Sequence, residues 1–335
     1  MLSVSLAAEC DRLASRNLAP LRSIAEYTSA ANPVSPTFPR QDAVGNVVGA
    51  LTEMPVRVWP PSLHESGPTR VIEFNLQDEL ELDWRATSPN LLASFLRVCA
   101  NESLTTEAAA TSHSFYCIRG AGATMTEFGV VDWKEGDLFV VPVSKEAAVH
   151  HASEDSALYW INDEPLMSYL GAVPTKPKFK QTFYSRERMV EEVATVRRET
   201  EGKAMNRTGI LLGNKATEQN TLTLTHTLWS LLNCIPANTA QRPHRHNSVA
   251  LDLAVVATPG VYTLMGPELD EEGWVKDPIR CEWATGGVFS TPPGWWHSHH
   301  NESDEDAFVL PMQDAGLYTH QRTLDIQFSA ERPKL

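Results

Sequence analysis

The chain has 335 residues, of which 42% are hydrophobic and 21% are charged, and its formal net charge is -14. This composition is typical of a soluble globular protein that can bury one large or two ordinary cores. The negative charge argues against nucleic acid and against an anionic membrane surface as partners, because binding to phosphate groups needs clustered cations. We therefore expect a small-molecule ligand.

The five cysteines are scattered and form no CxxC pair, so they indicate neither a zinc knuckle nor a disulfide framework. Reduced thiols of this kind favour a cytoplasmic location. No apolar run approaches the length of a membrane span. The first ten residues lack a basic leader and include Glu9, so we do not expect a signal peptide.

The N-terminal region is predicted to hold helices followed by an extended arm. Apolar residues recur at helical spacing from Ser5 to Tyr27, and Pro20 divides them into two short helices. Residues 28–67 are rich in proline, serine and asparagine, and we expect this arm to pack on a neighbouring subunit. The first predicted domain boundary therefore follows residue 67.

Two strand-rich blocks follow the arm. From Thr69 onward, short alternating apolar segments bounded by turn residues predict strands. The clearest are residues 71–76, 115–118, 138–142 and 157–161. We assign 68–165 to a first β-domain, 166–205 to a helical linker and 206–335 to a second β-domain. Within the linker, residues 165–170 and 185–200 predict helices, the second with Ser185 as its N-cap.

The two blocks are copies of one unit. Residues 133–142 align with 283–292: each segment starts with tryptophan, passes a glycine turn and ends in proline after an apolar run. Histidines follow both segments, at His150 and His151 in the first block and at 297, 299 and 300 in the second. Duplicated units of short strands predict closed barrels, because closure removes open sheet edges. The predicted fold class is all-β, with two double-stranded β-helix (jelly-roll) barrels and short peripheral helices.

Three histidines form a candidate metal site. His244 and His246 are two residues apart, so in a strand they project from the same face. His297, on a later strand, can complete a face of three imidazoles. Such a set leaves coordination positions open, which suits iron, zinc, copper or nickel used for chemistry. The alternative is three hydrogen-bonded histidines in a polar barrel mouth.

Other candidate site residues surround this set. Asp252 shares the strand face of His244 if no bulge intervenes, so it is a candidate catalytic residue or the partner of an arginine. His299 is a second catalytic candidate, which would orient the site. Trp229, Trp296 and Arg242 are candidates for substrate binding, although such residues also form core, pocket wall or surface ion pairs.

The first block lacks an equivalent histidine set. At the position of the first motif, residues 111–114 supply only His113 rather than a spaced pair. His150 and His151 lie downstream of it. We therefore expect the first barrel to be free of metal and to serve as a scaffold and dimer surface.

The motifs resemble those of the gentisate 1,2-dioxygenase family, whose members are bicupins. The likeness is clearest over residues 205–315, in Leu228-Trp229-Ser230-Leu231-Leu232, Pro243-His244-Arg245-His246, Ala250-Leu251 and Trp296-His297-Ser298-His299. Residues 136–142 and 163–167 resemble that family's metal-free cupin. The resemblance implies that His244, His246 and His297 hold Fe(II). With molecular oxygen as co-substrate, the enzyme would cleave an aromatic diol of the gentisate or hydroquinone type, as a homodimer or homotetramer.

A rival interpretation is a cupin that is not an oxygenase, either a metal-assisted isomerase or lyase or a small-molecule sensor without turnover, because the fold supports many functions. Two departures from the family pattern bear on the substrate. No glutamate follows His246 by four or five residues, and Asp252 stands where the gentisate enzymes have an arginine. An inward carboxylate would repel a substrate carboxylate by roughly 4 kcal/mol at about 4 Å and an effective dielectric of about 20. We therefore expect a neutral diol unless an arginine neutralises Asp252.

Overall fold

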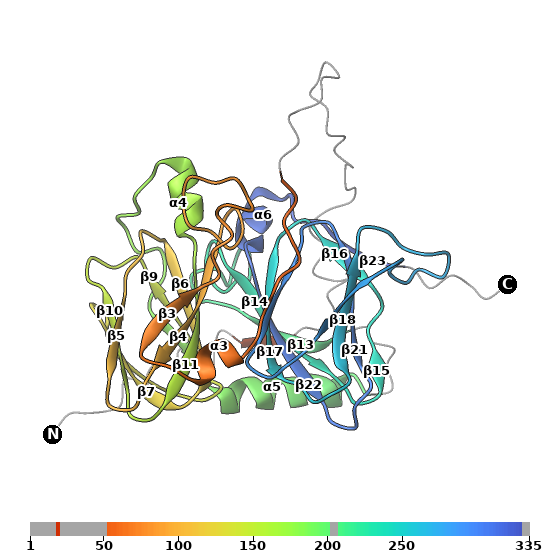
Figure 1. Cartoon of the computed structure of the whole chain (residues 1–335), viewed down its shortest axis with the longest axis horizontal. Coiled ribbons are helices and arrows are strands. Elements are labelled where there is room, and N and C mark those ends of the chain that lie inside the picture. Colours follow the sequence, from red (N-terminus) through yellow and green to blue (C-terminus); the bar gives the residue numbers. More distant parts are fainter. Residues whose placement is uncertain (1–17, 21–51, 202–206, 330–335) are drawn as a thin grey trace, which may run out of the picture.

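The computed structural model describes residues 18–20, 52–201 and 207–329. Two β-barrels lie side by side, each made of a larger and a smaller antiparallel sheet, and the larger sheets face each other (Figure 1). The predicted all-β architecture with two barrels and short peripheral helices is confirmed. In the described part of the chain no helix is long and apolar enough to cross a membrane.

The first barrel consists of a six-stranded and a four-stranded sheet. In spatial order the six-stranded sheet contains β12 (Thr182–Tyr184), β9 (Leu138–Pro142), β6 (Ser112–Arg119), β11 (Ser156–Asn162), β4 (Leu92–Val98) and β3 (Arg70–Glu73). The four-stranded sheet contains β5 (Ser103–Thr106), β10 (Ala148–Ala152), β7 (Ala121–Thr126) and β8 (Gly129–Lys134).

The second barrel repeats this topology. Its seven-stranded sheet contains β1 (Leu18–Pro20), β13 (Thr208–Leu212), β14 (Trp229–Ile235), β22 (Ala307–Gln313), β17 (Ala250–Val256), β20 (Val288–Thr291) and β2 (Val58–Trp59). The opposing sheet contains β19 (Ile279–Glu282), β18 (Val261–Gly266), β21 (Trp296–Asn301), β16 (His244–His246) and β23 (Ile326–Phe328), with β15 (Thr239–Ala240) also paired to β21. The order β9-β6-β11-β4 corresponds to β20-β17-β22-β14, so the chain contains two copies of one unit.

Strand pairing gives the residue correspondence between the barrels. His244 lies opposite His297, and at the same place in the first barrel Thr106 lies opposite Ala148. The first motif of the first barrel therefore runs from Thr106 to residue 108, and its placement at residues 111–114 from the sequence was wrong. His113 attracted that assignment because it is the histidine closest to the expected position, but it lies on the neighbouring strand β6.

Within the described residues, four helices lie around the barrels: α3 (Ser62–Glu65), α4 (Glu164–Leu170), α5 (Arg186–Glu199) and α6 (Ala315–Gln321). Ser185 caps α5 as predicted, because its side chain accepts a hydrogen bond from the backbone N–H of Arg188 at 3.3 Å. The buried face of α5, formed by Met189, Val193 and Val196, packs into the core shared by both barrels.

A continuous apolar layer joins the two barrels. Because side chains alternate along a strand, Tyr159 and Ile161 on β11 enter this layer while Trp160 points into the first barrel. On β17, Leu251 and Leu253 enter the same layer from the other side. The Tyr159 hydroxyl donates to the carbonyl oxygen of Leu251 at 3.2 Å, which ties the two sheets together.

The N-terminal region differs from its prediction where the structure describes it. Leu18–Pro20 is a strand paired with β13, not part of a helix. Proline disfavours the helical conformation for the residue before it, and the free edge of β13 offers hydrogen bonds to an extended segment. The remaining predicted helical residues, and residues 28–51 of the arm, lie outside the described residues.

Residues 52–67 of the predicted arm pack on this same chain. Val58–Trp59 extends the sheet of the second barrel by pairing with β20. Trp59 stacks on Phe74 with ring centroids 4.5 Å apart, and Arg97 of the first barrel donates to the carbonyl oxygen of His64. Likewise β12, within the predicted linker, joins the first barrel. Edge pairing uses backbone groups alone, so the side-chain pattern did not indicate it.

The shared layer leads to a stability prediction. Leu251 is fully buried in it, so we expect Leu251→Ala to lower the free energy of unfolding by about 2–5 kcal/mol through lost burial and a residual cavity. The matched control is Val256→Ala, since Val256 lies on the same strand but is 36% exposed. We expect the control to stay within about 0.5 kcal/mol of wild type. Urea unfolding would test this, and equal losses for both variants would contradict the arrangement.

Candidate metal centre

Three buried histidines converge at one end of the second barrel. β16 brings His244 and His246 to one face, and β21 brings His297 opposite His244. One ring nitrogen from each lies within 4.8 Å of those of the other two. The ring centroids of His244 and His297 are 3.9 Å apart, and those of His246 and His297 are 4.9 Å apart. This spacing fits three ligands around one metal ion.

Backbone carbonyls orient two of these rings. The Nδ1 atom of His246 lies 2.8 Å from the carbonyl oxygen of Ser248, and the Nδ1 atom of His297 lies 3.1 Å from that of Trp295. A carbonyl oxygen only accepts, so we assign the proton to Nδ1 in both rings. The Nε2 lone pairs then remain available for a metal, which is the usual way in which a protein fixes a histidine ligand.

The third ring has a different partner. Nη2 of Arg207 donates to Nδ1 of His244. A guanidinium has no acceptor, so Nδ1 supplies the lone pair in this arrangement. A metal bound at Nδ1 would use that lone pair, and a metal bound at Nε2 would require the ring proton to move to Nδ1. Coordination by His244 therefore requires Arg207 to give up this hydrogen bond.

Burial keeps the candidate ligands neutral. Loss of hydration lowers the pKa of His246 to about 4. It also lowers the pKa values of His244 and His297 well below the usual range, and the Arg207 cation adds to this effect at His244. Neutral imidazoles are the form that binds metal, so at neutral pH no proton has to be removed from a charged ring before coordination.

A cavity of about 30 Å³ adjoins the three histidines. Its polar lining consists of the triad together with Arg207, Asn233, Asp252, His299 and Gln313. Trp229 contributes to its apolar wall. The structure thus brings Asp252, His299 and Trp229 to the triad. Asp252 faces the cavity as predicted, but from β17 of the opposing sheet, because the strand of His244 ends at His246.

Two predicted substrate-binding residues lie elsewhere. Trp296 precedes His297 on β21 and so points to the opposite face, where the guanidinium of Arg245 lies 5.0 Å from its ring centroid. Arg242 lies before β16, with its guanidinium 4.6 Å from the ring centroid of Trp274 and a hydrogen bond to the carbonyl oxygen of Glu272. Neither residue lines the triad cavity, so the structure does not bring them to the triad and their role in substrate binding stays a prediction.

Asp252 and His299 are the two titratable side chains that line the cavity beside the triad and Arg207. Thr291 donates a 2.6 Å hydrogen bond to Asp252, but burial outweighs it and raises the pKa of this carboxyl to about 7. Trp283 donates to the Thr263 hydroxyl at 2.9 Å, and that hydroxyl lies 2.9 Å from Nδ1 of His299. We assign the hydroxyl as the donor to Nδ1, which leaves the His299 proton on Nε2.

The sequence interpretation missed Arg207, Asn233 and Gln313. Asn233 had a detectable signal, because it is a polar residue within the apolar run of β14 and its side-chain amide pairs with Gln241 at 3.2 Å. Arg207 had none: it precedes β13 and is brought to His244 by the pairing of β13 with β14 and by barrel closure.

Comparisons with known proteins identify the fold. No protein-family model and no curated protein sequence matches the chain. A salicylate 1,2-dioxygenase from Pseudaminobacter salicylatoxidans is structurally similar, with a TM-score of 0.65 and 14% identity over 91% of this chain and 95% of that one. The chain has a bicupin fold like that of this dioxygenase.

Two further structures share the bicupin fold. A point mutant of the salicylate 1,2-dioxygenase in complex with gentisate gives a TM-score of 0.63 and 16% identity over 87% of this chain and 91% of that one. A deletion mutant of oxalate decarboxylase from Bacillus subtilis gives a TM-score of 0.51 and 14% identity over 80% of this chain and 78% of that one.

The triad geometry predicts one metal per chain. We expect purified protein to bind one equivalent and the double variant His244→Ala/His246→Ala to lose it, because two of three ligands are gone. His151→Ala is the matched control, since His151 is an exposed histidine of the first barrel. Elemental analysis that finds two equivalents in wild type, or full retention in the double variant, would contradict the assignment.

Burial of neutral histidines also predicts acid sensitivity of the metal-free protein. Seven buried histidines of the described residues have lowered pKa values: His64, His113, His150, His244, His246, His297 and His299. Unfolded histidines take up protons below about pH 6.5 while those in the fold stay neutral to about pH 4, so stability falls as pH drops through this window.

Three buried aspartates with raised pKa values, Asp137, Asp252 and Asp314, oppose this trend. Burial raises the pKa values of Asp252 to about 7 and Asp314 to about 6, so these groups contribute stability at low pH that is lost as pH rises through those values. Urea unfolding of chelator-treated protein at pH 6.5 and pH 4.5 should show the net loss. Asp252→Asn should make the loss on acidification larger, and a pH-independent stability would contradict the buried neutral rings.

Proposed function

We propose that the protein is a non-haem iron(II) dioxygenase that cleaves the ring of an aromatic diol of the gentisate or hydroquinone type with molecular oxygen. The observation that carries the proposal is the buried triad, in which backbone carbonyls leave two Nε2 lone pairs available beside a third imidazole. The bicupin fold shared with a salicylate 1,2-dioxygenase supports it.

The residues around the triad have complementary roles in this proposal. A bound Fe(II) would supply open coordination positions for a diol and for oxygen. Asp252, with a pKa of about 7, can accept a proton from a substrate hydroxyl at neutral pH. His299 can donate a hydrogen bond from its Nε2–H group to a substrate oxygen. Trp229 provides an apolar wall for the ring.

Charge in the cavity favours an anionic substrate more than Asp252 alone suggests. Arg207 is fully buried in the same cavity, and burial lowers its pKa only to about 9, so it stays cationic at neutral pH. Asp252 is partly protonated there. A neutral diol was expected unless an arginine neutralised Asp252. Arg207 lies in the cavity and offsets the charge of that carboxylate, so the condition is met. We propose a hydroxylated aromatic acid as the better substrate.

The cavity must enlarge to admit such a ring. An apolar cavity of about 150 Å³ holds benzene, whereas the triad cavity measures about 30 Å³. Release of Arg207 from His244, which metal coordination requires, would provide space and would let the Nη2 group of Arg207 donate to a carboxylate.

The small cavity also favours the alternative function. A metal-assisted lyase that acts on a substrate of a few atoms needs no enlargement, and the fold is shared with oxalate decarboxylase. Oxygen consumption separates the two proposals, because a lyase of this kind consumes no stoichiometric oxygen.

Activity measurements test the proposal directly. We expect the iron-loaded protein to consume oxygen with gentisate, and with hydroquinone at lower kcat/KM.

Arg207→Gln should raise KM for gentisate about tenfold or more through loss of a charge-assisted hydrogen bond, while KM for hydroquinone changes little. Asp252→Asn should lower kcat while improving tolerance of carboxylated analogues. An iron-loaded protein that consumes no oxygen with either compound would refute the dioxygenase proposal.

We also propose that the protein is a cytoplasmic homodimer or homotetramer. The free thiols of Cys99, Cys117, Cys234 and Cys281 agree with a reducing compartment. Light scattering that finds only a monomer would contradict the oligomer.

A further inference from the structure

The first barrel retains part of the metal-site architecture. Trp133 donates to the Thr124 hydroxyl at 2.9 Å, and that hydroxyl lies 2.8 Å from Nδ1 of His150. This is the same relay that Trp283, Thr263 and His299 form in the second barrel. His150 is therefore the counterpart of His299.

Small residues replace the triad in the first barrel. Strand pairing makes Thr106 the counterpart of His244 and Ala148 the counterpart of His297, and the same two-residue spacing makes Ala108 the counterpart of His246. The lost imidazole volume leaves a cavity of about 220 Å³, compared with about 30 Å³ beside the triad. All three replacement residues line this larger cavity.

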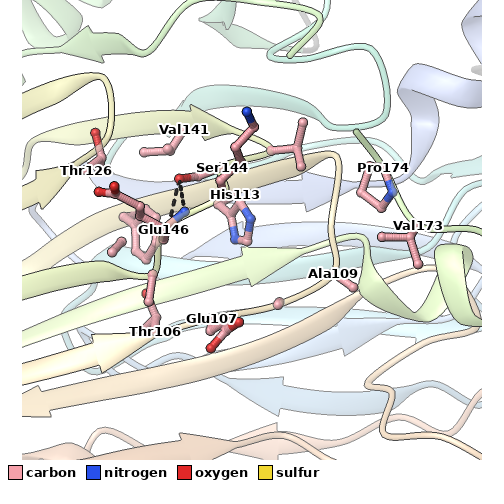
Figure 2. A pocket seen from close by; sticks show the side chains of 16 residues that line it. Thr106, Glu107, Ala109, His113, Thr126, Val141, Ser144, Glu146, Val173 and Pro174 are labelled. Carbon is pink, nitrogen blue, oxygen red and sulfur yellow. Dashed lines mark hydrogen bonds between the residues drawn. The ribbon is translucent and has the colours of Figure 1, made fainter. Parts of the chain in front are cut away.

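His113 supplies a polar group within this cavity. Its ring projects into the pocket (Figure 2) and lies parallel to the rings of Phe115 and Trp160, at interplanar angles of 9° and 12°. The indole N–H of Trp160 donates to Nδ1 of His113 at 3.4 Å. Burial lowers the pKa of His113 to about 4, so the neutral ring carries its proton on Nε2. His113 is thus a hydrogen-bond donor within an aromatic wall.

The rim of the cavity limits the charge of a ligand. Glu107, Lys145 and Glu146 line it and are exposed, and the sum of their charges is -1. Ser144 and Glu146 fold the loop beside it through hydrogen bonds between the Ser144 hydroxyl and the Glu146 backbone (Figure 2). A carboxylate ligand would therefore meet no net attraction at the entrance, whereas an uncharged ligand meets no electrostatic barrier.

We propose that the first barrel holds a second small-molecule site, separate from the metal centre, that binds an uncharged single-ring aromatic compound through an acceptor oxygen. The ring would lie against Phe115 and Val141, and its oxygen would accept from Nε2 of His113. The volume suits this class, because benzene occupies a cavity of about 150 Å³ and the remainder accommodates one small polar substituent.

Three compounds of similar size test the recognition chemistry: benzamide, with an uncharged acceptor oxygen, toluene, with no acceptor, and benzoate, with a negative charge. Titration of the metal-loaded full chain, followed by protein NMR or calorimetry, should give the tightest binding for benzamide. His113→Phe should weaken benzamide about tenfold, in line with loss of one hydrogen bond, and change toluene less than about twofold. His113→Gln, which keeps a donor, should recover most of the affinity.

Further variants separate this site from the metal centre. Ala109 is exposed at the cavity wall, so Ala109→Phe should block benzamide without disturbing the core. His151→Gln, on an exposed position of β10, and His244→Ala, in the second barrel, should leave benzamide binding unchanged. The proposal is overturned if toluene binds wild type as tightly as benzamide, if Ala109→Phe has no effect, or if His244→Ala abolishes binding.

Discussion

The apolar layer between the two large sheets is the constraint on which the rest of the structure depends. Each strand at this junction has one face in the layer and one face in its own barrel, so the direction of a site residue on these strands follows from its parity. Leu251 and Leu253 occupy the layer, which forces Asp252 into the triad cavity. A shift of one residue in β17 would bury the carboxylate between the barrels, at a high desolvation cost. Packing of the apolar neighbours thereby determines that Asp252 faces the triad cavity.

The candidate metal centre combines fixed and movable parts. His246 and His297 are held by backbone carbonyls of residues next to the strands, whereas His244 is held by the side chain of Arg207. The two fixed rings keep their Nε2 atoms directed to one point before any metal arrives, which reduces the ordering cost of coordination. The third ring can bind only after a cation has withdrawn. Metal binding by His244 would therefore be coupled to loss of its hydrogen bond with Arg207.

Much of this arrangement follows from the sequence, and the exceptions share one cause. The i, i+2 pair at His244 and His246, the third histidine from the repeat and the inward direction of Asp252 all depend on local strand periodicity. Arg207, the edge strands β1, β2 and β12, and the counterparts of the triad in the first barrel depend on which strands become neighbours. Long-range strand pairing determines these neighbours, and it is made by backbone groups that leave no pattern in the side chains. Trp296 is a simpler case, because its position directly before His297 already places it on the opposite face of β21.

The edge strands have a consequence for how this chain can be divided. β2 precedes the first barrel in sequence but completes the larger sheet of the second barrel. There it covers the free edge of β20, which lies two strands away from β22. A fragment that starts after α5 would lack it and would present that edge to other molecules, a template for aggregation. The barrels are copies of one unit, yet neither is a module that could be transferred intact by a single cut. Any fusion, domain swap or recombination of this gene product has to carry the segment around residues 52–67 along with the metal-bearing half.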